Sequence, residues 1–193
     1  MNRMRALSTV AATLLATAGL AAADDLVGKP APDFALKDLS GKEYSLKALR
    51  GKIVVLEWAN KDCPIWRGVL GKLNKTCEDY ATEDQNIIWL AIDSTHNMKP
   101  EDNQAFMKEK GVTRPVLDDR EGTVGKAFKA RTTPHMFIID KDGKVVYDGA
   151  FDNQTKGDQY VNYVAKALDE LKAGKPVGTA RTNPYGCSVK YKP

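Results

Sequence analysis

Apolar strand-like runs alternate with amphipathic helical stretches, and this alternation most constrains the fold of the chain. The runs 53–58 and 86–92 are rich in β-branched and aromatic residues, which favour strands. The intervening stretch 64–80 carries apolar residues at helical spacing, namely Trp66, Leu70, Leu73, Cys77 and Tyr80. Apolar strands separated by helices predict a sheet that is covered on both faces.

The remaining segments extend this α/β pattern. Two short strands at 34–37 and 43–46 predict an N-terminal β-hairpin, and 136–140 with 144–147 predict a second hairpin around Lys141-Asp142-Gly143. We expect helices at 100–110, near 123–128 and at 160–171, and a short strand at 115–117. The chain is therefore predicted to form one domain over residues 24–173, with a mixed central sheet, followed by an irregular tail over 174–193.

The N-terminus has the features of a secretory signal. Arg3 and Arg5 precede an apolar stretch from Ala6 to Leu20, and Ala21-Ala22-Ala23 resembles a cleavage site. Removal of residues 1–23 leaves 170 of the 193 residues and lowers the formal charge from +4 to +2, because two arginines are lost. We therefore predict a periplasmic or secreted protein. So small a charge predicts neither a nucleic acid nor a membrane surface as a partner.

The three cysteines are an odd number for an exported chain, which favours redox chemistry over a structural disulfide framework. Cys63 follows the strand 53–58 and precedes Pro64, which suits the first position of a helix. The positive end of a helix stabilises a thiolate, so the pKa of Cys63 is expected to be low. A small buried apolar residue is the alternative interpretation of Cys63.

The other two cysteines differ in their reach. Cys77 lies 14 residues beyond Cys63, about 21 Å along a helix, which is too far for a disulfide. Its place on the apolar stripe predicts a buried, inert thiol. The tail from Gly174 spans about 40 Å when extended, so Cys187 reaches either of them. Cys63 is the preferred partner, and a structural Cys77–Cys187 disulfide is the alternative.

Several motifs in this order resemble a known family. They are Gly28-Lys29-Pro30-Ala31-Pro32-Asp33-Phe34, Trp58, Cys63-Pro64, Thr132-Thr133-Pro134-His135, Phe137 to Gly143, and Tyr185-Gly186-Cys187-Ser188-Val189-Lys190. With them the chain resembles the thioredoxin-fold redoxins related to alkyl hydroperoxide reductase and thiol-specific antioxidant proteins. The resemblance implies a thioredoxin-like fold, a thiol-dependent redox activity, and a cis-proline at Pro134 that faces the reactive thiol.

The chain departs from two patterns of these redoxins. Trp66 stands where a Cys-x-x-Cys motif has its second cysteine, so Cys63 has no neighbouring resolving thiol. Leu56 and Asn60 stand where the peroxidase motif has proline and threonine, and Arg131 lies in the loop before Pro134. We therefore expect Cys187 to resolve intermediates formed at Cys63, and hydrogen peroxide to be a poor substrate.

Besides Trp66 and Arg131, two further residues, Glu57 and His135, are candidates for supporting roles at the site. Glu57 resembles the buried acid that some thioredoxin-fold proteins use for proton transfer, and an edge-exposed glutamate is the alternative. His135 is placed to partner the thiolate of Cys63 or to bind a soft metal with it. One cysteine and one histidine are too few ligands for a typical protein metal site, so we predict no metal and no cofactor.

The sequence thus predicts an exported thiol–disulfide oxidoreductase, or antioxidant-type redoxin, whose partner is a thiol or disulfide in a protein or small molecule. The alternative is a non-enzymatic thioredoxin-fold binding protein or metal carrier.

Overall fold

A mixed five-stranded sheet in the order β5-β4-β3-β7-β8 forms the centre of the structure, a computed structural model that describes residues 26–193. The predicted signal peptide lies outside the described residues. The sheet contains β3 (Ile53–Trp58), β4 (Ile87–Asp93), β5 (Val116–Asp118), β7 (Met136–Ile139) and β8 (Val145–Gly149). β3 runs parallel to β4 and antiparallel to β7, and all six of its residues are buried. The mixed sheet and its apolar central strand confirm the prediction.

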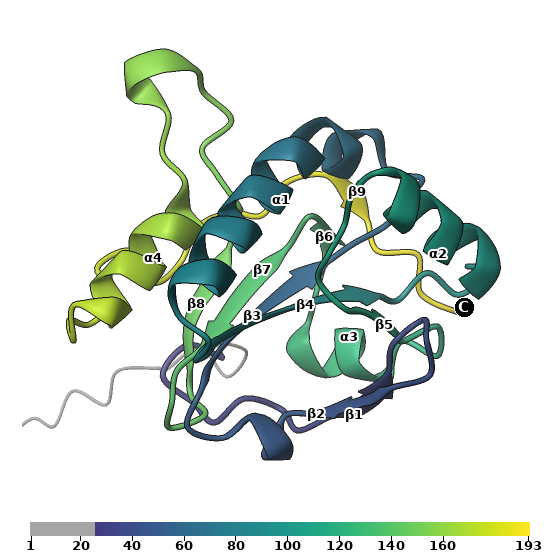
Figure 1. The fold of residues 1–193 in the computed structure, drawn as a ribbon, viewed down its shortest axis with the longest axis horizontal. Helices are drawn as coiled ribbons and strands as arrows, with labels where there is room; N and C mark the ends of the chain where they lie inside the picture. Colours follow the sequence, from purple (N-terminus) through teal and green to yellow (C-terminus); the bar gives the residue numbers. More distant parts are fainter. Residues whose placement is uncertain (1–25) are drawn as a thin grey trace, which may run out of the picture.

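Helices and a hairpin cover the two faces of this sheet (Figure 1). On one face, α1 (Pro64–Glu83) and α4 (Tyr163–Lys172) pack their apolar sides, and α2 (Pro100–Glu109) adds Met107 to the same core. On the other face lie α3 (Thr123–Phe128) and the hairpin of β1 (Ala35–Lys37) and β2 (Glu43–Ser45). Short 3-10 turns occur at Lys47–Leu49 and Gly157–Gln159. This is a thioredoxin-like arrangement.

The predicted elements all form, with small shifts at their ends. The last helix begins at Tyr163 rather than at Tyr160, because the Asn162 side chain caps it by accepting a hydrogen bond from the Ala165 N–H (3.0 Å). Within residues 26–193, no helix has both the length and the apolar character that a membrane crossing needs.

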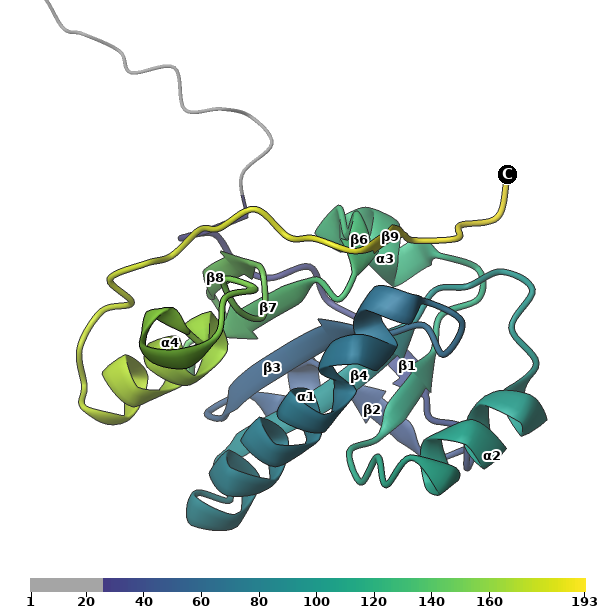
Figure 2. The same cartoon turned by 90° about the horizontal axis from the view of Figure 1, so that it is seen from above.

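The C-terminal tail is more ordered than the sequence predicts. Its residues Cys187–Ser188 form β9, which pairs antiparallel with β6 (Thr132–Thr133), so that Cys187 lies opposite Thr133 and Ser188 opposite Thr132. Figure 2 shows the tail running from α4 across the top of the molecule to β6, above the first turn of α1. A strand of two residues has no periodicity, so the sequence pattern could not reveal it.

Candidate active site

Cys63 is the residue that caps the N-terminus of α1. Its Sγ accepts a hydrogen bond from the Trp66 N–H (3.4 Å), and Pro64 occupies the first turn, where a missing N–H is tolerated. The sulfur therefore lies at the positive end of a 20-residue helix, as the sequence predicts. Only 1% of the Cys63 surface is exposed. A partner must therefore displace part of the protein to reach this sulfur.

Cys187 is brought directly to Cys63 by the pairing of β9 with β6. The two Sγ atoms are 2.7 Å apart, and both cysteines are free thiols. Cys77 lies about four turns further along α1, buried in the core, so the tail meets Cys63 rather than Cys77. Burial raises the pKa of the Cys77 thiol to about 11, which keeps it protonated and unreactive at neutral pH.

The two paired sulfurs differ in acidity. Burial disfavours the Cys63 thiolate, but hydrogen bonds from Cys187, Thr133 and the Trp66 N–H outweigh it and lower the pKa of Cys63. The hydrogen bond with Cys63 raises the pKa of Cys187, because the Cys187 thiol must keep its proton to donate to a Cys63 thiolate. The arrangement thus favours a Cys63 thiolate beside a protonated Cys187.

The segment before β7 forms the wall that faces Cys63. The Thr133–Pro134 peptide bond is cis, and the Thr133 carbonyl oxygen lies 3.1 Å from the Cys63 Sγ. Gly186 lies against the same carbonyl at a φ of 124°, where any Cβ would clash with Thr133. Only glycine allows the tail to approach this closely, so Gly186 sets the position of Cys187.

Beneath the site, Glu57 is fully buried and held by three side chains. The Trp66 and Trp89 indole N–H groups donate to its two oxygens (2.7 and 2.8 Å). Arg114 donates from Nη2 (2.8 Å), and its Nε lies 2.7 Å from Oε2 without hydrogen-bond alignment. The edge-exposed alternative for Glu57 is therefore wrong. The carboxylate anchors the Trp66 ring, which occupies the place of a second motif cysteine.

His135 and Arg131 lie elsewhere than the sequence suggests. His135 Nδ1 accepts the Arg131 backbone N–H (3.1 Å), and Nε2 bonds Asp148 (2.7 Å). Burial lowers the pKa of His135, and the bond to Asp148 offsets part of this effect. Both ring nitrogens are engaged, so the expectation that His135 partners the Cys63 thiolate is wrong. The exposed Arg131 side chain borders a shallow hollow with Asp148 and Thr182 instead.

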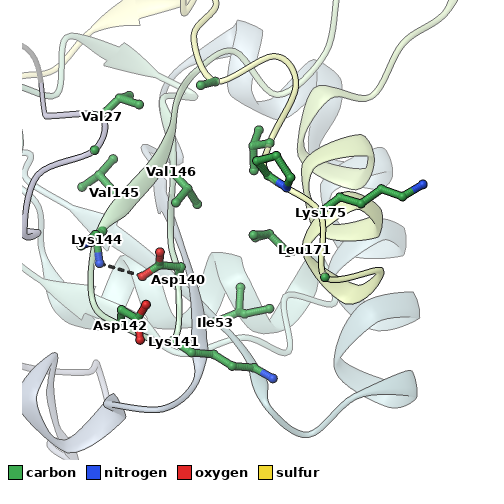
Figure 3. Close-up of a pocket in the computed structure, with 15 residues that line it drawn as sticks. Val27, Ile53, Asp140, Lys141, Asp142, Lys144, Val145, Val146, Leu171 and Lys175 are labelled. Atoms are coloured by element: carbon green, nitrogen blue, oxygen red, sulfur yellow. Dashed lines mark hydrogen bonds between the residues drawn. The ribbon is translucent and has the colours of Figure 1, made fainter.

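Sequence reasoning missed Arg114 and Thr133 as parts of this site. Each acts through a long-range contact, Arg114 with Glu57 and Thr133 with Cys187. Arg114 stands in no local pattern that predicts it, whereas the place of Thr133 directly before the expected cis-proline is a signal that could have found it. A separate cavity of about 610 Å³ lies between the β7–β8 turn and the start of the tail (Figure 3). Ile53, Val145 and Leu171 contribute to its wall, and none of the predicted site residues does.

The fold and the site define a thioredoxin-like protein with a cysteine pair at a helix N-terminus. The sequence model described as AhpC/TSA family matches residues 27–148, and the chain belongs to this family. It is 32% identical over 145 residues to the thiol-disulfide oxidoreductase ResA of Bacillus thuringiensis, covering 75% of this chain and 78% of that protein.

Solved structures agree with the fold. An uncharacterized conserved protein from Geobacillus kaustophilus superposes with a TM-score of 0.77 at 30% identity, covering 86% of this chain and 93% of that chain. A putative thioredoxin from Neisseria meningitidis gives a TM-score of 0.57 at 26% identity, covering 74% and 87% of the two chains.

Proposed function

We propose that this protein is an exported thiol–disulfide oxidoreductase in which Cys63 is the reactive thiol and Cys187 the resolving thiol. The observation that carries the proposal is the 2.7 Å approach of Cys187 Sγ to Cys63 Sγ at the N-terminus of α1. The similarity to proteins named thiol-disulfide oxidoreductase supports the reaction class. Export to the periplasm or the medium rests on the signal-like residues 1–23.

The first step is attack of the Cys63 thiolate on one sulfur of a substrate disulfide. A bond forms between Cys63 Sγ and that sulfur, the substrate S–S bond breaks, and its second sulfur leaves as a thiolate. The lowered pKa of Cys63 increases the fraction of the attacking thiolate. The product of this step is a mixed disulfide between the protein and the substrate.

Cys187 completes the reaction. Once Cys63 is bonded to substrate it carries no negative charge, so the main cause of the raised pKa of Cys187 is removed and Cys187 loses its proton more readily. Its thiolate attacks Cys63 Sγ and expels the remaining substrate sulfur as a thiolate. The substrate has gained two electrons and the protein holds a Cys63–Cys187 disulfide. An external dithiol then reduces this disulfide and closes the cycle.

The proposal is tested by assaying dithiothreitol-coupled reduction of a protein disulfide such as that of insulin. Cys63→Ser should abolish the activity, and Cys187→Ser should accumulate a mixed disulfide between Cys63 and the substrate. Cys77→Ala is the matched control, because it removes a cysteine that faces the core, and it should retain activity. Full activity in Cys63→Ser would overturn the proposal.

A further inference from the structure

The tail is attached to the rest of the protein both upstream and downstream of Cys187, by different kinds of contact. Upstream, the Thr182 N–H donates to the Asp148 carbonyl (3.2 Å) and the Thr182 hydroxyl accepts the Ala150 N–H (2.8 Å). The Tyr185 hydroxyl also donates to the buried Asp152 carboxylate (2.5 Å). These bonds tie the tail to β8 and the loop after it before it reaches Cys187.

Downstream of Cys187, one large side chain anchors the tail. The half-buried Tyr191 ring lies over Gly122 and Gly125 of the α3 region, and its hydroxyl donates to the Ala130 carbonyl (2.8 Å). A Cβ at Gly122 or Gly125 would lie 2.7 or 2.6 Å from ring carbons of Tyr191. The two glycines thus form a seat shaped for this ring, and any larger side chain there would expel it.

The other contacts downstream of Cys187 are weaker than the contacts of the Tyr191 ring. Two backbone bonds join the downstream tail to the body, from the Val189 N–H to Arg131 (3.0 Å) and from the His96 N–H to Lys190 (2.9 Å). The Lys192–Glu121 ion pair is solvent-exposed on both sides, so it contributes little. On this side the apolar contacts come from Val189, which packs against the core, and from the Tyr191 ring in its seat.

We propose that Tyr191 is a positioning residue that latches the tail, so that Cys187 faces Cys63 when the latch is closed and Cys63 is uncovered when it opens. The proposal rests on the redox function of the Cys63–Cys187 pair. Cys63 is 1% exposed with the tail in place, so a protein disulfide reaches it only after residues 187–191 leave β6. Return of Tyr191 to its seat then delivers Cys187 for the resolving step.

Opening of the tail should change two measurable quantities in opposite directions, the alkylation rate of Cys63 and the stability of the Cys63–Cys187 disulfide. Loss of the Tyr191 ring should uncover Cys63, which speeds its alkylation in the reduced protein. The same loss lowers the effective concentration of Cys187 at Cys63, which weakens their disulfide relative to glutathione. A variant that only destabilised the fold would also speed the alkylation of the buried Cys77, whereas opening of the tail should leave Cys77 unlabelled.

The test measures both quantities in full-length protein carrying Tyr191→Ala, Tyr191→Phe or the control Lys192→Ala. We expect Tyr191→Ala to raise the iodoacetamide rate at Cys63 about tenfold and to lower the equilibrium constant of the Cys63–Cys187 disulfide in glutathione buffers about tenfold, roughly 1.4 kcal/mol. Tyr191→Phe keeps the ring in its seat and should stay within about threefold of wild type on both. Lys192→Ala should change neither.

Unchanged values for Tyr191→Ala would overturn the latch while leaving the thiol chemistry intact. Absence of a Cys63–Cys187 disulfide in the wild-type protein would overturn the proposed function instead. A chain ending at Lys190 provides a second variant that removes the ring without altering any core residue, and it should reproduce the Tyr191→Ala result. Equal rates in this shortened chain and wild type would contradict the latch.

Discussion

Replacing Arg114 by methionine should strongly destabilise the protein, because it leaves the Glu57 carboxylate buried without its cation. Arg114 is 5% exposed and Glu57 is fully buried, so water cannot replace the lost partner. Removing one member of such a pair costs about 3–5 kcal/mol. For a chain of this size that is a fall of about 10 °C in Tm.

The control is the double variant Arg114→Met/Glu57→Gln, which removes both charges. It should recover about 1–2 kcal/mol of the loss, although one indole N–H, of Trp66 or Trp89, is left without an acceptor. Urea unfolding of wild type, both single variants and the double variant completes a double-mutant cycle. If Arg114→Met costs less than about 1 kcal/mol, or if the double variant is less stable than Arg114→Met, the charge-pair account of Glu57 is wrong.

Three further predictions concern titration and reactivity. Burial raises the pKa of Asp93 from 3.8 to about 6. The contribution of Asp93 to the free energy of unfolding is therefore favourable at low pH and is lost as pH rises from about 4 to 6. Asp93→Asn should remove up to about 3 kcal/mol of this pH dependence, measured by urea unfolding. Cys77, with a pKa of about 11, should resist iodoacetamide at pH 8 until the protein is unfolded, whereas fast labelling of the native state would contradict its burial. Hydrogen peroxide should oxidise Cys63 less than about 100-fold faster than a small thiolate in stopped-flow tryptophan fluorescence, because Leu56 and Asn60 replace the proline and threonine of the peroxidase motif and the exposed Arg131 borders another hollow.

Local patterns were sufficient to predict the sheet, the helices and the place of Cys63 at a helix start. The apolar runs at β3 and β4 and the stripe of α1 depend on neighbouring residues only, so their periodicity shows in the sequence. Cys63 followed by Pro64 likewise marks a helix start. The tail length alone left both Cys63 and Cys77 open as partners of Cys187.

The sequence could not predict contacts between distant segments. The choice of Cys63 depends on the pairing of β9 with β6 and on the close approach of Gly186 to Thr133, neither of which has a periodic signal. His135 follows Pro134 directly, yet its ring turns to Asp148 on β8, a partner that only the folded sheet brings near. Burial and pairing across the fold, rather than residue type, decided these roles.

The central claim, that Cys63 and Cys187 form the redox pair, is tested most directly by mapping the disulfide of the oxidised native protein by mass spectrometry after tryptic digestion without reductant. The account predicts a linked pair of peptides, Asp62–Arg67 with Thr182–Lys190, that disappears on reduction, while Cys77 is recovered as a free thiol. A link between Cys77 and Cys187 with Cys63 free would contradict it, and would make the tail a structural crosslink.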